Sequence, residues 1–308
     1  MNRLERLERE AIQFIRNSEK LALRMDSRGF HVAFSGGKDS MVVLELVKRA
    51  GVKYHAEMQV TSVDSPNLMK FVRKHYKDVN LNLPKDNMYK IITRKGMLPE
   101  RYARYCCQIL KEQAGKDCVT VVGVRRAESV RRSKRNSVEL FGKHGYSYVI
   151  NGENLVQQQV GGEQLFDNDS KENVYCVSGK DKIVISPIID WKDSDVWNFI
   201  KKYNMPYCNL YDMGFHRIGC LFCPMASPKE KARELEMFPR IAEKIYIRAI
   251  QDLMSKGKYN DFDSAEDVFK FWISNKNKKK YFSDKEKEKN SLFLSLKRWQ
   301  IKNKQNKR

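Results

Sequence analysis

"FHVAFSGGKDSMVVLELVKRAG", residues 30–51, changes character twice within a short distance. An apolar run typical of a buried strand ends at Ser35, and apolar residues return at helical spacing from Met41 to Ala50, with Gly51 as a helix stop. Two glycines and several small polar residues stand between the two apolar segments. The pattern predicts a strand, a tight glycine loop and a helix, in that order.

The loop has the composition of an anion-binding site. Glycines let the backbone turn tightly and approach a ligand, and the first N–H groups of a helix have no partner within the helix. Hydroxyl and ammonium donors would add to the attraction, and a carboxylate could hold Mg²⁺ against phosphates. We therefore predict phosphate binding by the residues Ser35, Gly36, Gly37, Lys38, Asp39 and Ser40. The spacing of a Walker A loop is absent.

The strand–helix rhythm continues along the chain. Apolar segments at 52–63, 118–124 and 182–189 predict further strands, and periodic segments at 3–25, 67–76 and 192–204 predict helices. Asp193 or Ser194 is expected to cap the last of these helices. The alternation predicts an α/β fold, an open and mostly parallel sheet with helices on both faces.

Composition divides the chain into regions. We predict an N-terminal helix over 1–27, a nucleotide-binding domain over 28–225 and a basic helical region over 226–308. Residues 133–181 form a polar, weakly periodic insertion within the middle domain. Such an insertion is either a plain surface loop or a lid over the substrate, and the sequence leaves both open.

Net charge and cysteine content indicate which partners and which cellular compartment to expect. The net charge is +21, and residues 276–308 hold thirteen Lys/Arg against three Asp/Glu. Clustered positive charge is typical of nucleic-acid binders, although a solvated surface gives the same count. No apolar stretch is long enough to cross a membrane, and the N-terminus has no signal-peptide pattern. We expect a cytoplasmic protein, in which cysteines serve as metal ligands or redox groups.

Three segments carry a family resemblance. The loop "SGGKDS" resembles the PP-loop of the ATP pyrophosphatase superfamily, and residues 121–132 and 186–214 resemble the phosphoadenosine phosphosulfate (PAPS) reductase family. The resemblance implies an adenine nucleotide α-hydrolase-like fold that binds ATP and Mg²⁺. It also implies catalytic roles for Lys38, Asp39, Arg125 and Arg126, and nucleotide contacts by Gly123 and Thr61. A helix-capping turn is the alternative for Thr61.

Five cysteines are candidate metal ligands. Cys220 and Cys223 form a Cys-x-x-Cys pair, whose spacing suits one metal centre, either an Fe–S cluster or zinc. "RYCCQILK" resembles a motif of the sulfurtransferase of DNA phosphorothioation systems. That resemblance implies a [4Fe–4S] cluster on Cys106, Cys208, Cys220 and Cys223, with Cys107 as an alternative ligand or sulfur carrier. We interpret Cys118, Cys176 and His31 as ordinary core residues.

The resemblance implies an ATP-dependent sulfurtransferase that adenylates a nucleic acid, DNA or tRNA, releases pyrophosphate and replaces oxygen by sulfur. A sulfur donor such as a cysteine desulfurase would be a partner, and a homodimer is an open option. The alternatives are an assimilatory sulfur enzyme and a non-catalytic nucleic-acid-binding regulator. A reductase would need a nucleophilic cysteine near its C-terminus, and no cysteine follows Cys223.

Overall fold

The computed structural model describes residues 2–289 apart from 113, 142–145, 152–153 and 160–181. The chain forms two compact units, one of Met1–Met88 with Pro99–Leu221 and one of Tyr89–Leu98 with Phe222–Arg308. The second unit thus combines the C-terminal part of the chain with a short internal segment. Nothing in the sequence pattern indicated that internal contribution.

The first unit is built on a six-stranded sheet with the order β3-β2-β1-β4-β8-β5. All neighbouring pairs are parallel except β5 with β8. This arrangement confirms the predicted open, mostly parallel α/β sheet. Its strands are β1 (Phe30–Phe34), β2 (Tyr54–Gln59), β3 (Asn80–Asn82), β4 (Val119–Val121), β5 (Val138–Phe141) and β8 (Lys182–Ile185).

The strand β1 is the centre of this sheet. It pairs with β2 from Phe30 opposite Tyr54 to Phe34 opposite Met58, and with β4 on its other side. The chain runs outward from β1 to β3 and then crosses to β4, so the strand order reverses between β1 and β4. In open α/β sheets, ligands bind beyond the carboxyl ends of the strands at such a reversal. The glycine loop follows β1 at this point.

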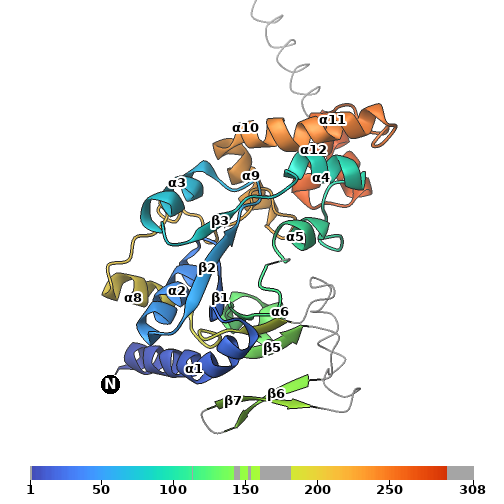
Figure 1. Ribbon diagram of the computed structural model, residues 1–308. Helices are drawn as coiled ribbons and strands as arrows, with labels where there is room; N and C mark the ends of the chain where they lie inside the picture. Colours follow the sequence, from blue (N-terminus) through green and yellow to red (C-terminus); the bar gives the residue numbers. More distant parts are fainter. Residues whose placement is uncertain (1, 113, 142–145, 152–153, 160–181, 290–308) are drawn as a thin grey trace, which may run out of the picture. The chain divides into compact units, whose positions relative to one another are not determined.

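Helices cover the sheet of the first unit. Both α1 and α8 pack against α2, the helix that follows the glycine loop (Figure 1). Apolar faces at helical spacing account for this packing. The helical elements of the unit are α1 (Arg3–Met25), α2 (Lys38–Ala50), α3 (Pro66–His75), α5 (Tyr105–Leu110), η1 (Arg126–Glu128), α6 (Val130–Ser133) and α8 (Asp193–Lys202).

Several element ends differ from the sequence prediction. The helix α2 begins at Lys38 rather than Met41, because the polar loop residues already have helical backbone. The cap of α8 is Lys192, not Asp193 or Ser194; its N–H donates to the carboxylate of Asp195 over 2.8 Å. The predicted strands at 52–63, 118–124 and 182–189 are shorter in the structure, where β2 covers Tyr54–Gln59, β4 Val119–Val121 and β8 Lys182–Ile185.

The interpretation of His31 as a satisfied core residue is only half right. The side chain is 2% exposed, and Nδ1 lies 3.2 Å from Oγ1 of Thr120. Its Nε2, however, has no hydrogen-bond partner. Burial lowers the pKa of His31 to about 3, so the ring is neutral at physiological pH.

The predicted insertion contains strands that its weak periodicity concealed. The strand β5 pairs antiparallel with β8 at the sheet edge, and β6 (Tyr146–Asn151) and β7 (Asn154–Gln159) form a separate antiparallel pair. The remainder of the insertion, residues 160–181 with Cys176, lies outside the described residues. In the described part of the chain, no helix has the length and apolar composition needed to span a membrane.

The second unit is helical, as the sequence after Pro224 predicts. A cluster of aromatic rings forms its core, in which Phe222 packs against Tyr246 and Phe269, and both of these contact Trp272. The hydroxyl of Tyr89 donates to Asp252 and ties the internal segment to α11. The elements are α4 (Met88–Lys95), α9 (Pro228–Met237), α10 (Pro239–Ile241), the π-helical turn η3 (Ala242–Ile247), α11 (Arg248–Ser255) and α12 (Ala265–Ser274).

One buried carboxyl group makes the second unit sensitive to pH. Glu234 is 8% exposed, and its carboxylate accepts the N–H of Phe222 over 2.6 Å. Burial raises the pKa of Glu234 from 4.5 to about 7. The folded protein therefore binds this proton more tightly than the unfolded chain does, and stability falls as the pH rises through this range.

We predict that Glu234→Gln removes this pH dependence. Glutamine keeps an oxygen that accepts the Phe222 N–H but cannot ionise, so the variant should gain stability relative to the native protein between about pH 5 and about pH 8. Urea unfolding followed across this range is the measurement. The exposed Glu236→Gln on the same helix is the control. A constant stability difference for Glu234→Gln across the range would contradict the prediction.

Candidate functional site

The glycine loop joins the carboxyl end of β1 to the amino end of α2. Gly36 has a φ of 69°, a left-handed conformation that residues with a side chain disfavour. A Cβ atom at Gly36 would also lie 2.5 Å from Cδ1 of Leu68. Gly37 then caps α2 in an extended conformation without a side-chain hydrogen bond to the first turn. The start of α2 thus has the geometry of a helix N-terminus available to an anion.

The two serines of the loop bind one another. The N–H of Ser35 donates to Oγ of Ser40 over 3.2 Å, and the two hydroxyl oxygens lie 3.1 Å apart. The Ser40 hydroxyl also donates to the carbonyl of Gly37 over 2.9 Å. In this structure both hydroxyls therefore fix the shape of the loop, and a phosphate would have to compete for them.

A tyrosine hydroxyl accepts the hydrogen bond of the first N–H group of α2. The N–H of Lys38 donates to Oη of Tyr211 over 2.8 Å, and Nζ of the same lysine lies 5.8 Å from the ring centre. Burial raises the pKa of Tyr211, so the hydroxyl is uncharged at neutral pH. A phosphate that accepts this N–H must replace the hydroxyl. Sequence reasoning missed Tyr211, since nothing local signals a contact with a residue 173 positions earlier.

Two cations and two carboxylates form a network beside the loop. Nζ of Lys38 lies 3.1 Å from Asp193 and 3.5 Å from Asp39. The Arg125 guanidinium, which is buried, donates to Asp39 over 2.6 Å and to Asp193 over 2.9 Å. Burial opposes ionisation of Asp193, but the hydrogen bond and charge of Lys38 outweigh it and lower the pKa of Asp193. In this structure Arg125 positions Asp39.

The next arginine of the motif lies in different surroundings. Arg126 is half-exposed and forms an ion pair with Asp190, and its Nε donates to the carbonyl of Arg135 over 2.9 Å. The structure therefore separates the two neighbouring arginines. Arg125 belongs to the loop network, whereas Arg126 lies at the surface, paired with Asp190.

Gly123 lies where β4 leaves the sheet beside the amino end of α2. A Cβ atom at this position would come within 2.7 Å of the carbonyl carbon of Asp39 and 3.0 Å of the N atom of Ser40. Backbone atoms cannot move aside as a flexible side chain can. The sequence indicated Gly123 through its motif, and the structure supplies the reason, which is a close approach of two backbone segments.

The segment after β2 forms a capping turn and contacts a cysteine. Thr61 is buried, and its N–H donates to the carboxylate of Asp64 over 2.6 Å. Oγ1 of Thr61 lies 3.4 Å from Sγ of Cys220. Asp64 and Cys220 also form a backbone bridge. The capping turn that the sequence offered as an alternative is present, and ribose contact by Thr61 stays a prediction.

The paired cysteines lie on the short helix α5. Cys106 is buried, and its thiol hydrogen-bonds the sulfur of Cys107. Nη2 of Arg104 lies 3.2 Å from the same Cys107 sulfur. The hydrogen bond from Cys106 and the charge of Arg104 outweigh burial and hold the pKa of Cys107 well below its ordinary value. Cys107 therefore has the environment of a thiolate.

Lys111, at the end of the cysteine motif, connects this pair to Cys220. Its ammonium group hydrogen-bonds the sulfur of Cys220, and Asp64 and Cys107 contribute further attraction. The charge of Cys220 raises the pKa of Lys111 despite desolvation. In the sequence, Lys111 is the last residue of the quoted segment "RYCCQILK", and it was not predicted as a site residue. A cationic group beside cysteine sulfurs stabilises negative charge on them, which suits a site that binds a metal or handles sulfur.

The remaining two candidate ligands lie in other segments. Cys208 is buried in the turn after α8, with its Sγ 3.9 Å from Oδ1 of Asn209, and burial raises its pKa. Cys223 belongs to the second unit, where its carbonyl accepts the N–H of Ala226. All six cysteines of the described part of the chain are free thiols. Thiols are the donors that an Fe–S cluster needs, so Cys107 and Cys220 beside Lys111, together with Cys106 next to Cys107, fit that chemistry.

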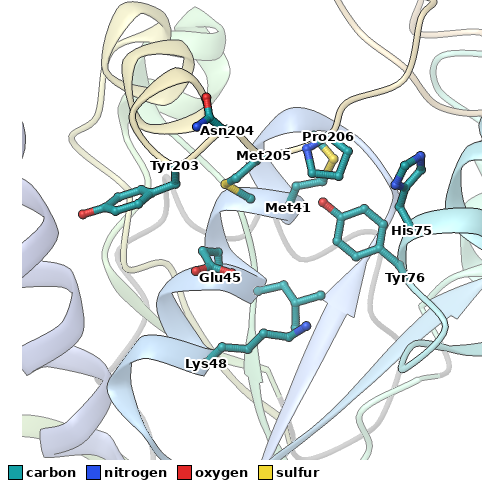
Figure 2. Close-up of a pocket in the computed structure, with 10 residues that line it drawn as sticks. Met41, Glu45, Lys48, His75, Tyr76, Tyr203, Asn204, Met205 and Pro206 are labelled. Carbon is teal, nitrogen blue, oxygen red and sulfur yellow. The ribbon is translucent and has the colours of Figure 1, made fainter.

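A cavity of about 240 Å³ lies along the side of α2, away from the glycine loop (Figure 2). Met41 and Glu45 of α2 face Tyr76 and the segment 203–206 across it. Lys48, which also lines the cavity, is paired with Asp78 over 2.6 Å. None of the predicted site residues lines this cavity.

The reversal of strand order, the glycine loop after β1 and the close approach of Gly123 define a PP-loop domain of the adenine nucleotide α-hydrolase fold. The chain belongs to the phosphoadenosine phosphosulfate reductase domain family, whose profile matches residues 29–226. The family resemblance seen in the sequence is thereby confirmed.

Comparisons with known proteins give relatives of moderate identity. An uncharacterized protein of Methanocaldococcus jannaschii is 26% identical over 253 residues, 79% of this chain and 53% of that protein. Adenosine 5'-phosphosulfate reductase 2 of Bacillus subtilis is 25% identical over 68% of this chain and 78% of its own length. The chain spans about half the length of the first curated relatives. The solved PAPS reductase of Candida auris matches with a TM-score of 0.43 and 17% identity over 71% of this chain and 96% of that one.

We predict that Gly123→Ala destabilises the first unit by about 1–3 kcal/mol, because the added methyl group overlaps backbone atoms of Asp39. The measurement is the free energy of unfolding in urea. Gly219→Ala is the matched control, since no atom lies within 4 Å of a Cβ there. Equal stability of the two variants would contradict the close approach of Gly123, after β4, to the backbone at the start of α2.

Proposed function

We propose that this protein is an ATP-dependent sulfurtransferase that adenylates a nucleic-acid acceptor and then replaces the activated oxygen by sulfur. One observation carries the ATP assignment. The loop keeps Lys38, which is buried at the start of α2 beside Asp193 and within a network that also fixes Asp39. Such a fixed positive charge at a helix N-terminus suits the phosphates of ATP.

In the first half-reaction an oxygen of the acceptor attacks the α-phosphorus of ATP, and pyrophosphate leaves. Lys38 and the first N–H groups of α2 would stabilise the charge that develops on the phosphates. Asp39 and Asp193 supply carboxylate oxygens suited to the Mg²⁺ that accompanies ATP. Arg125 would keep both carboxylates in place, and the exposed Arg126 would contact the acceptor.

In the second half-reaction sulfur bonds to the activated atom of the acceptor. The bond from that atom to its oxygen breaks, and AMP leaves with this oxygen and the bonding electron pair. We propose that a persulfide made by a partner such as a cysteine desulfurase supplies the sulfur. Its terminal sulfur bonds to the activated atom, and a second thiol then attacks the inner sulfur, so that the two thiols end as a disulfide and the acceptor keeps the transferred sulfur. The thiolate character of Cys107 and the nearby Lys111 support sulfur handling at this position.

A [4Fe–4S] cluster is the cofactor that the donor set suggests. Cys106, Cys208, Cys220 and Cys223 would hold it, with Cys107 as an alternative ligand and zinc as an alternative metal. When bound, such a cluster would position sulfur or hold the cysteine segments together, since four cysteine ligands leave no iron open to accept sulfide. What supports it is that Cys107 and Cys220 both lie beside Lys111, and that Cys106 hydrogen-bonds Cys107.

We predict that Lys38→Met lowers acceptor-dependent pyrophosphate release by about 100-fold, because it removes a preorganised charge from the phosphate site. The assay combines the full chain, prepared without oxygen, with Mg-ATP, a sulfide or persulfide donor and pools of DNA or tRNA. The exposed Lys201→Met is the control. Sulfur incorporated into nucleic acid is measured by mass spectrometry of nucleosides and dinucleotides.

Two outcomes would overturn the proposed function. One is the absence of pyrophosphate release with every acceptor pool, and the other is release that Lys38→Met leaves unchanged. A second candidate function is reduction of adenosine 5'-phosphosulfate, which relatives named as such reductases favour. Release of sulfite from that compound with a thiol reductant would establish it instead.

The positive charge supports nucleic acid as the partner. Residues 297–308, which lie outside the described residues, contain six Lys/Arg and no Asp/Glu. Mutation of residues 276–289 would disturb the fold as well as binding, because Tyr281 and Lys285 bind the carboxylate of Asp267 within the second unit. Cations that contact phosphates release counterions, which makes binding weaken with salt.

We predict that replacing the six cations of 297–308 by glutamine weakens nucleic-acid binding and flattens its salt dependence. Each lost phosphate contact should reduce the slope of log K against log salt by about 0.7–0.9. Fluorescence anisotropy at several salt concentrations is the measurement. Glutamine at Lys53 and Lys85, both on the first unit, serves as the control. An unchanged slope would place the interface elsewhere.

A further inference from the structure

A second group of polar side chains lies at the opposite edge of the sheet from the glycine loop. Asp26 caps α1 just before β1, His55 is the second residue of β2, and Cys118 directly precedes β4. These strands are parallel, so their amino ends share one edge. One ligand atom from each of the three side chains lies within 4.8 Å of the other two.

Strand register adds a further imidazole to this group. His31 of β1 pairs with His55 on one side and with Thr120 on the other, so the three side chains project from the same face. The centroids of the two histidine rings lie 5.4 Å apart. Nε2 of His31, 3.6 Å from a carboxylate oxygen of Glu57, and Nδ1 of His55 both lack a hydrogen-bond partner.

Unpaired buried nitrogens need a physical reason. A buried polar atom without a partner costs about 1–3 kcal/mol, and two lie on adjacent strands here. A ligand that accepts the lone pair of a neutral imidazole would remove part of this cost. Metal ions are such ligands, and imidazole is among their commonest protein donors.

The carboxylate of the group is already fixed in orientation. Nη2 of Arg28 donates to Oδ2 of Asp26 over 2.7 Å, and Nε of the same arginine lies within 3.2 Å of both oxygens. The thiol of Cys118 donates to Oδ2 of Asp26 over 3.2 Å. An arginine that orients a ligating carboxylate is a common outer-sphere arrangement in metal sites.

The backbone before Cys118 is also fixed. Gly115 has a φ of 69°, and a Cβ atom there would lie 2.4 Å from Oγ1 of Thr120 and 2.5 Å from Nδ1 of His31. This segment therefore packs directly on the histidine face of the sheet. Cys118 itself is 3% exposed, and its thiol also lies 3.3 Å from the carbonyl oxygen of Lys116, so the sulfur has little freedom.

We propose that Asp26, His55 and Cys118 bind one divalent cation of the zinc type at the amino edge of the sheet. Thiolate, imidazole and carboxylate together suit zinc, whereas magnesium and calcium prefer oxygen ligands alone. Binding forms a metal–sulfur bond, and the thiol proton of Cys118 passes to the buffer. A water completes a four-coordinate shell. Since the ion would join the segments at the starts of β1, β2 and β4, its role is to hold this edge together.

The zinc site is independent of the cysteines around Lys111 and of the proposed sulfur transfer. Zinc added to the protein can also bind those other thiols, so total zinc content does not test the proposal. The informative quantity is the difference in bound zinc between the native protein and a variant in which only a residue of the amino edge is changed. Titration with Zn²⁺ under reducing, oxygen-free conditions, followed by dialysis and elemental analysis, gives this difference.

The full chain with His55→Gln should retain about one zinc equivalent less than the native protein and should lose the thermal stabilisation that zinc confers. His75→Gln, the same substitution on α3, is the matched control and should bind zinc as the native protein does. Circular dichroism checks that each variant is folded. Equal zinc content in folded His55→Gln and native protein would overturn the proposal.

A measurement on the unmutated protein covers the case in which His55→Gln does not fold. The chain has five histidines, so selective ¹⁵N labelling of imidazoles gives a spectrum of few signals. The His55 signal, assigned by elimination with His31→Gln, His75→Gln, His144→Gln and His216→Gln, should shift on addition of Zn²⁺. A His55 signal that stays in place while zinc saturates the protein would equally overturn the proposal.

Discussion

A buried guanidinium group is the interaction on which the loop side of this protein depends. Arg125 donates to Asp39 at the start of α2 and to Asp193 at the start of α8, and it follows the turn at the end of β4. One side chain thus ties together three segments distant in sequence. The planar fork of arginine suits two carboxylates at once, and a lysine could not replace it. Since both carboxylates are held by cations, Asp39 and Lys38 keep fixed positions beside the phosphate loop.

Contacts between segments distant in sequence also organise the cysteines of the first unit. Lys111 binds Cys220 and lies close to Cys107, while Thr61 contacts the Cys220 sulfur from the end of β2. The segment after the second strand therefore contacts the sulfur of Cys220 directly. This proximity supports a reaction in which a nucleotide bound at the sheet edge and a sulfur atom meet at one acceptor, as we propose.

The sheet has two chemically different edges. Its carboxyl edge gathers the glycine loop, Gly123 and Thr61, whereas its amino edge gathers Asp26, His55 and Cys118. Parallel strands produce this division, because every strand contributes one end to each edge. A reactive edge that must exchange ligands benefits from an opposite edge that is held firmly, and the proposed cation would serve that purpose.

The sequence by itself determined the sheet class, the glycine loop, the family and the helical nature of the region after Pro224, because local periodicity and short motifs encode them. It did not determine that Tyr211 binds the Lys38 N–H, that Lys111 lies beside Cys220, or that residues 89–98 join the second unit. It also did not show that His31 lies beside His55, since only strand register places the two side chains together. These contacts join residues far apart in the chain, and such pairings arise only when the strands are aligned and the side chains packed.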